Sequence, residues 1–498
     1  MKNLTWQNPE QLFVAQELIN KVKSKCCGIK VDLLWQEGFV KRYDGIYLIT
    51  SLLYLKSLED MESVNVGNRI GEESVFVDCE KNKWSSLIDM DMFDAYPYYV
   101  DKIFPFLCLQ PLGIGFDSFC HIMPIRISEY GFFQILTEVG NIFADILEGA
   151  DIAKDNISIY GDIFECLLTY LDGNFAENHI LLAPKNLRQL LCELAQFQGD
   201  ETVYDPAMGI GNLLVEANKQ MLIKRSSGDK LIDNQDGFPE FKKNEITSVS
   251  GYWDDEKILE GDEGDMGYLF LAQMNFYFHH INLQQPQFKR GMLAGLMRTL
   301  HFDRVISVMK PHRPLPKIID DSIMKLAQDG IAVLVVPLQF LYNSSKRYSN
   351  VRIKLLEQFC VEAVISLPDH EFAPQSSIRT AIIVVSKRRT SANHKIWFCD
   401  LKNDGYSNDM KRIKNIDTPL PYLVQSFLKK EEIHNDWFDS ELVSLKEVLE
   451  NDASLLVAQY IDICDDIMEE IDLDLIISHL DDLQYKIKGG IDELKRYL

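Results

Sequence analysis

The chain has 498 residues, enough for two or three domains with large hydrophobic cores. Its formal net charge of −24 argues against strong DNA binding by this chain alone, because phosphate contacts need clustered Lys and Arg side chains. The 10 cysteines form no Cys-x-x-Cys pair, and we find no signal peptide and no apolar run long enough to span a membrane. We therefore expect a cytoplasmic protein with reduced, mostly buried thiols and no zinc site.

Residues 1–155 are predicted to form a helical N-terminal domain. Apolar residues recur at helical spacing from Phe13 to Val22, and the run 46–60 is typical of a strongly apolar helix. A further helix is expected at 135–147. Periodicity by itself predicts only that these are core helices.

A strand, a glycine turn and a helix are predicted in direct succession after residue 201. Thr202–Tyr204 are β-branched or aromatic, as in a short buried strand, and Asp205 follows at the strand end. Gly209 and Gly211 permit a tight turn, and Asn212 is the expected N-cap of the helix. A carboxylate, a Gly-x-Gly turn and a helix N-terminus at the end of a strand together indicate a nucleotide-type pocket.

Residues 156–410 alternate strand and helix patterns, which predicts an α/β domain with a doubly wound, mostly parallel sheet. The polar segment 224–244 is expected to loop out of this domain. The predicted strands are 202–204, 246–251, 304–308, 331–336, 363–366 and 381–386, with 396–399 as an edge strand.

Residues 411–498 are predicted to form an acidic helical tail. Apolar residues recur every three or four positions over 473–498, the pattern of an amphipathic helix with a coiled-coil-like seam. Packing on its own chain and docking on a partner are both consistent with this helix.

The sequence Asp-Pro-Ala-Met-Gly-Ile-Gly at 205–211 resembles motif I of S-adenosylmethionine-dependent DNA methyltransferases, whose usual form is Asp-Pro-Ala-Cys-Gly-x-Gly. Leu214 stands where a dinucleotide fingerprint needs its third glycine, which argues against a nicotinamide oxidoreductase. The resemblance implies that S-adenosylmethionine is the cofactor. The residues it implicates in cofactor binding are Asp205, Pro206, Ala207, Gly209 and Gly211.

Further stretches resemble the methylation subunits of type I restriction–modification systems, in the order and at the spacing of that family. The matching stretches are 52–62, 161–168, 271–275, 361–368 and 375–385. The resemblance implies an adenine-N6 DNA methylation subunit that meets DNA in a complex with a separate specificity subunit. It also implies that the helix at 473–498 is a candidate docking element for that partner.

The catalytic motif of that family is absent. Its members carry Asn-Pro-Pro-(Phe/Tyr) after Phe-Asp and a strand, and the Asn accepts the hydrogens of the flipped adenine amine. Here Phe302-Asp303 and the strand are followed by Met-Lys-Pro-His-Arg-Pro at 309–314. Ser307 and His312 are the available replacements, but a histidine in a proline-rich loop is more often incidental. We assign no catalytic residue.

The expected cofactor contacts are also reduced. Leu181-Leu-Ala-Pro184 lacks the threonine of the family's Phe-Tyr-Thr-Pro, and Trp253 replaces the acid that holds the ribose hydroxyls. Asp254 is the nearest candidate to replace that acid. The sequence therefore predicts a catalytically impaired methylation subunit. The alternative is a pseudo-methyltransferase scaffold that binds DNA or partner subunits without methyl transfer.

Overall fold

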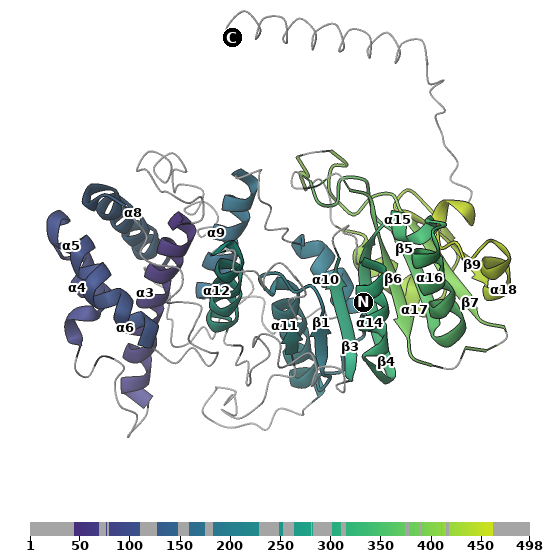
Figure 1. The fold of residues 1–498 in the computed structure, drawn as a ribbon, viewed down its shortest axis with the longest axis horizontal. Helices are drawn as coiled ribbons and strands as arrows, with labels where there is room; N and C mark the ends of the chain where they lie inside the picture. Colours follow the sequence, from purple (N-terminus) through teal and green to yellow (C-terminus); the bar gives the residue numbers. More distant parts are fainter. Residues whose placement is uncertain are drawn as a thin grey trace, which may run out of the picture.

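In the residues that the computed structural model describes, a group of helices lies beside a nine-stranded sheet that carries helices on both faces (Figure 1). The structure describes residues 44–68, 76, 79–109, 127–147, 159–174, 183–228, 249–251, 263–279, 281, 301–309, 315–373, 376, 378–388, 390–391, 393–409, 411–414 and 418–461.

The N-terminal group is helical, as predicted. Helix α3 contains the predicted helix 46–60, and α8 contains 135–147, whereas the helix expected around Phe13 lies outside the described residues. The elements are α3 (Asp44–Asn68), η1 (Glu80–Asn82), α4 (Trp84–Ile88), α5 (Met92–Tyr98), η2 (Tyr99–Ile103), α6 (Phe104–Leu109), α8 (Glu129–Leu147) and α9 (Ile159–Asn174). Their buried apolar side chains form one cluster, in which Leu52, Phe132 and Phe164 are almost fully enclosed.

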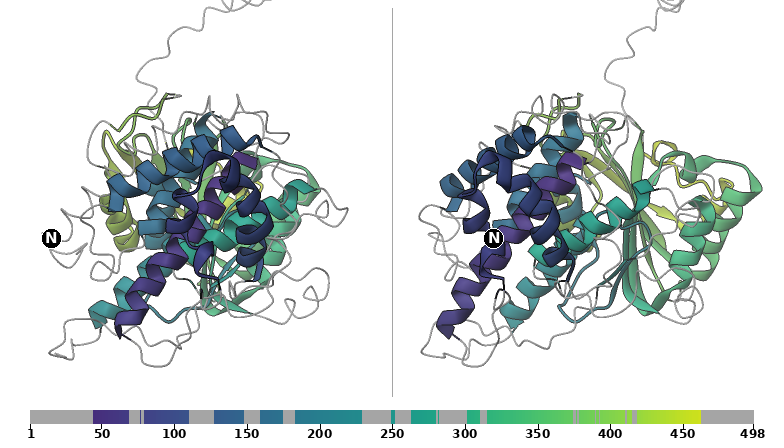
Figure 2. Two further views of the ribbon diagram at one scale, coloured as in Figure 1. Left: turned by 90° about the vertical axis from the view of Figure 1, so that its left-hand side faces the viewer. Right: turned by 60° about the vertical axis from the view of Figure 1, so that its left-hand side comes forward.

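Helix α12 (Glu263–Phe278) joins this helical group to the sheet. Its Phe270 and Met274 belong to the helical cluster, whereas Phe276 packs in the core against the sheet. Helices α9 and α12 lie side by side between the two groups (Figures 1 and 2). Helices α9 and α12 follow residue 155 in the sequence but share a hydrophobic core with α3, which precedes it. The expected domain boundary at residue 155 therefore does not coincide with a boundary between two hydrophobic cores.

The sheet confirms the predicted doubly wound α/β class and is mixed rather than mostly parallel. Its strand order is β2-β1-β3-β4-β6-β5-β7-β9-β8. Strands β2, β1, β3 and β4 are parallel, β6 is antiparallel to both β4 and β5, and β9 is antiparallel to β7 and β8. The strands are β1 (Val203–Asp205), β2 (Val249–Gly251), β3 (Phe302–Val308), β4 (Leu326–Pro337), β5 (Cys360–Ser366), β6 (Thr380–Ser386), β7 (Lys395–Leu401), β8 (Ile433–His434) and β9 (Phe438–Ser444).

Two expectations about the end of the chain are wrong. Strand β7 is not an edge strand, because it lies between β5 and β9. The segment after 410 is not purely helical, since β8 and β9 continue the sheet. Strand β9 was missed because it is polar: Asp439 and Ser440 are buried in it, and the Ser440 hydroxyl donates to the Glu431 carbonyl at 3.0 Å. The predicted helix at 473–498 lies outside the described residues.

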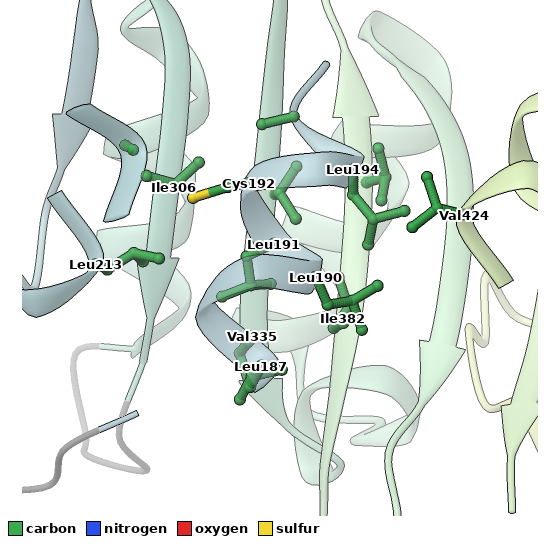
Figure 3. Close-up of a cluster of buried hydrophobic side chains, with 14 of the residues drawn as sticks. Leu187, Leu190, Leu191, Cys192, Leu194, Leu213, Ile306, Val335, Ile382 and Val424 are labelled. Atoms are coloured by element: carbon green, nitrogen blue, oxygen red, sulfur yellow. The ribbon is translucent and has the colours of Figure 1, made fainter. Parts of the chain in front are cut away.

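Successive residues of each central strand alternate between two cores, one on each face. The first face carries α10 (Lys185–Leu194), α11 (Asn212–Gly228) and α17 (Leu420–Lys429). Figure 3 shows leucines of α10 against Ile306, Val335 and Ile382 of the sheet. The second face carries α14 (Leu315–Met324), α15 (Gln339–Tyr342), α16 (Lys346–Gln358), α18 (Leu445–Glu450) and η4 (Val457–Gln459). Residues 224–228 belong to α11 and not to a loop, and the rest of the predicted loop, 229–244, lies outside the described residues.

Within the described ranges, no helix is long and apolar enough to cross a membrane, and no cluster of His, Cys, Asp and Glu side chains could hold a metal ion. Cys108, Cys192, Cys360 and Cys399 are buried, whereas Cys79 and Cys166 are partly exposed.

Candidate functional site

The predicted strand–turn–helix forms at the carboxyl edge of the sheet. Strand β1 ends at Asp205 and α11 begins at Asn212. The start of α10 lies at the same edge, because Asn186 in its first turn donates to Asp404, just beyond the end of β7, at 2.9 Å. Open α/β sheets bind their ligands in the crevice at this edge, where helix N-termini also point.

The two glycines of the turn have different structural roles. Both have positive φ, +55° at Gly209 and +80° at Gly211, where side chains are disfavoured. A Cβ at Gly211 would lie 2.3 Å from Cζ of Phe276, so this glycine allows α12 to pack on the turn. A Cβ at Gly209 would meet none of the described residues within 4 Å. Gly209 therefore leaves open space beside the backbone, as a ligand-binding turn requires.

Asp205 points into the protein. Its Oδ1 accepts hydrogen bonds from the Ala207 backbone N–H at 2.9 Å and from the Ser307 hydroxyl at 2.7 Å, and the residue is 1% exposed. Burial raises the pKa of Asp205 to about 7, although both hydrogen bonds oppose the increase. The carboxyl group therefore fixes the shape of the turn from beneath.

The structure brings five of the six predicted cofactor residues together in this turn. Asp205, Pro206 and Gly211 are buried, whereas Ala207 and Gly209 are exposed and could touch a ligand directly. The sixth, Asp254, lies outside the described residues.

Asn212 is not the N-cap that the sequence suggested. It is the first helical residue, and its Oδ1 accepts from Nδ2 of Asn275 on α12 at 2.6 Å. Asn275 Nδ2 also donates to the Ile210 carbonyl at 2.8 Å, so α12 ties down the turn. The buried Nδ2 of Asn212 has no partner among the described residues. Asn275 was not identified from the sequence as a site residue. A polar residue within a largely apolar helix was the feature that could have indicated such a role.

The end of β3, where the methylation motif would begin, is apolar. Val308 packs against the core, and Met309 is 3% exposed with its N–H bonded to the Val335 carbonyl at 2.9 Å. The Ser307 hydroxyl is fully buried and already donates to Asp205. Ser307 is therefore not free to replace the missing Asn, and His312 lies outside the described residues.

A second polar cluster lies at the same edge and was not predicted. Arg412 donates to Glu371 at 2.9 Å and to Asp404 at 3.2 Å, linking the segments that follow β5 and β7. Burial raises the pKa of Glu371 to about 8; Asp404 adds to this increase and Arg412 opposes it. Burial thus favours the protonated form of Glu371, and Arg412 lies between the Glu371 and Asp404 carboxyl groups. Through Asn186, this cluster also holds the start of α10.

Comparison with known proteins identifies similar sequences. A family model described as N-6 DNA methylase matches residues 155–307 and 318–467. The type I restriction enzyme MpnII methylase subunit of Mycoplasma pneumoniae is 24% identical over 385 residues, which cover 73% of this chain and 68% of that protein. The MjaVIII methylase subunit of Methanocaldococcus jannaschii is 20% identical over 394 residues, which cover 71% of this chain and 62% of that protein.

Solved structures share the fold. A chain from a study of the assembly and conformational transition of the type I R-M system has a TM-score of 0.63 at 18% identity, covering 96% of this chain and 97% of that one. A type I methyltransferase subunit from Streptococcus thermophilus has a TM-score of 0.59 at 16% identity, covering 90% of this chain and 100% of its own. At these identities the likeness concerns the fold.

Proposed function

Because the chain belongs to the N-6 DNA methylase family, we propose that it is a methylation-subunit-like component of a type I restriction–modification assembly, impaired in methyl transfer. It would hold S-adenosylmethionine at the turn after β1 and meet DNA in a complex with a specificity subunit. The apolar end of β3, at Val308 and Met309, is the observation that carries the proposal of impairment.

Three features of the turn support the cofactor assignment. Gly209 leaves open space beside an exposed backbone, and the first N–H groups of α11 have no carbonyl partners within the helix. The buried Nδ2 of Asn212, at that helix start, finds no hydrogen-bond acceptor among the residues that the structure describes. Gly209, the first turn of α11 and Asn212 would hold the cofactor, and Asp205 would support them. By resemblance, Asp254 would hold the ribose hydroxyls. When bound, S-adenosylmethionine supplies an electrophilic methyl group.

Methyl transfer to adenine N6 needs an acceptor for the amine hydrogens close to the cofactor. Neither Val308 nor Met309 has a polar side chain, and the Ser307 hydroxyl already donates to Asp205. The sequence that follows, Lys-Pro-His-Arg-Pro at 310–314, contains no Asn or Asp. A flipped adenine would therefore lack an Asn or Asp acceptor for its amine hydrogens at this place.

A scaffold without cofactor is the alternative function. The resemblance implies an acid where Trp253 stands and a second acid, for the adenine amine, where Met292 stands in Gly291-Met-Leu293. Losing these two acids would remove charged hydrogen bonds worth about 1.5–3 kcal/mol each. That loss is enough to turn micromolar affinity into millimolar affinity. In this case the chain would serve its assembly through protein contacts, with 473–498 as the candidate docking element.

Calorimetric titration of the full chain with S-adenosylmethionine decides between these functions. We expect micromolar to submillimolar binding that Gly209→Ala weakens, because the added Cβ fills the open space. Gly199→Ala is the matched control, since Gly199 also has positive φ, 128°, but precedes β1 at the opposite edge of the sheet. Absence of binding up to millimolar cofactor would leave the scaffold function.

A methylation assay tests the impairment separately. Radiolabelled S-adenosylmethionine and adenine-containing duplex DNA would be incubated with the chain, alone and with its specificity subunit. Binding of the cofactor without labelled DNA supports the proposal. Turnover at rates on the order of 1 s⁻¹ or higher, within the ordinary enzyme range, would refute the impairment.

A further inference from the structure

Ser307 lies where β3 extends beyond the end of its neighbour β1. The parallel register pairs Val203 with Arg304 and Tyr204 with Val305, and β1 stops at Asp205 while β3 continues to Val308. Ser307 is therefore placed beside the first residues of the turn. There its hydroxyl donates to Asp205 Oδ1 at 2.7 Å.

We infer that Ser307 is a positioning residue of the cofactor turn: its hydroxyl holds the Asp205 carboxyl so that the same oxygen also fixes the Ala207 backbone N–H. The inference rests on the proposed cofactor site and adds a residue that acts on it only through Asp205. Ser307 itself is fully buried and does not reach a ligand.

Both hydrogen bonds converge on a single carboxyl oxygen. Asp205 and Ser307 are 1% and 0% exposed, so water does not readily replace either partner. Without the hydroxyl, Oδ1 keeps only the Ala207 N–H, and the carboxyl loses the contact that fixes its rotation. The exposed backbone from Ala207 to Gly209 then loses its support from below.

The same hydroxyl acts on the charge of Asp205. Burial raises the pKa of this carboxyl to about 7, while the Ser307 hydroxyl and then the Ala207 N–H lower it. Within the described part of the chain, these two donors are the polar groups that act on it. Removing the hydroxyl therefore moves the pKa further upward, and Asp205 stays protonated at neutral pH.

The test uses the full-length chain with Ser307→Ala and the hydroxyl-retaining variant Ser307→Thr. Ser322→Ala is the matched control, since it removes another buried hydroxyl, one that donates to the Ile318 carbonyl within α14. In calorimetric titrations with S-adenosylmethionine at neutral pH, we expect Ser307→Ala to weaken binding about tenfold, because the turn that has lost its support must then be ordered when the cofactor binds. Ser307→Thr should restore affinity, and Ser322→Ala should leave it unchanged.

A second measurement needs no cofactor. The thermal unfolding midpoint is followed against pH for the unmodified chain and for Asp205→Asn. Because the folded pKa of Asp205 is raised, the unmodified chain loses stability relative to Asp205→Asn as pH rises from about 4 to about 7. When Ser307→Ala is compared with the double variant Ser307→Ala/Asp205→Asn, the loss of stability should extend to a pH about one unit higher.

The two measurements separate the inference from the function on which it rests. A chain that binds no cofactor refutes the cofactor site, while the unfolding titration still tests whether Ser307 acts on Asp205. An unshifted titration in Ser307→Ala, or the same shift in Ser322→Ala, overturns the inference even if affinity falls.

Discussion

Replacing Gly211 tests the contact between α12 and the turn. Gly211→Ala should lower the free energy of unfolding by about 2–5 kcal/mol. Placing a side chain at φ +80° costs about 1–2 kcal/mol. The new Cβ, 2.3 Å from Cζ of Phe276, forces a displacement in a close-packed core that costs about 1–3 kcal/mol more.

Gly209→Ala is the control for this measurement, since its φ is also positive but its Cβ meets nothing within 4 Å in the part of the chain that the structure describes. We expect it to cost only the backbone part, about 1–2 kcal/mol. Urea-induced unfolding of the full chain, followed by circular dichroism, gives both values. Phe276→Ala, alone and combined with Gly211→Ala, completes a double-mutant cycle in which the combined loss should be smaller than the sum. Equal losses for the two glycine variants would refute the assigned contact.

Two further predictions concern buried charges. Arg304→Met should destabilise the chain by about 3–5 kcal/mol, because Glu201, which accepts from Arg304 at 3.1 Å, is left as a buried charge without its cation. Adding Glu201→Gln should recover part of the loss in urea unfolding, and no recovery would show that the ion pair is not the cause. For Glu371→Gln we expect a gain in stability, relative to the unmodified chain, that grows as pH rises from about 4 to about 8, because the folded Glu371 keeps its proton while the unfolded one releases it. Urea unfolding of the unmodified chain and of Glu371→Gln at pH 5.5 and 8.5 measures the difference between their free energies of unfolding. The same difference at both pH values would contradict the prediction.

The strand–turn–helix at residue 205 was predictable because its determinants are local. β-Branched and aromatic residues favour the strand, and Gly209 and Gly211 can adopt positive φ without the steric cost that other residues pay. Strands β4 and β6 were found for a similar reason, since both of their faces are buried and residues 331–336 and 381–385 are continuously apolar.

The missed features depend on residues far apart in the sequence. Strand β9 is stabilised by backbone pairing with β7, which its polar sequence does not reveal. Asn212 resembled an N-cap, but its partner is Asn275, 63 positions away. The hydrogen bond from Ser307 to Asp205 forms only because β1 and β3 are neighbours in the sheet. The sequence specifies neither the register of these two strands nor the residue at which β1 ends.

The strand order of the sheet also determines how long β5 stays unpaired while the chain is being synthesised. Both sheet neighbours of β5, namely β6 and β7, follow it in the sequence. On the ribosome, β5 therefore emerges with both hydrogen-bonding edges unpaired, and β6 is complete only roughly 20 residues later. At about 5–20 residues per second, this apolar strand is exposed for about 1–4 s. Slowed translation between the emergence of β5 and that of β6 should therefore lower the yield of soluble protein, whereas slowed translation after β9 has emerged should not.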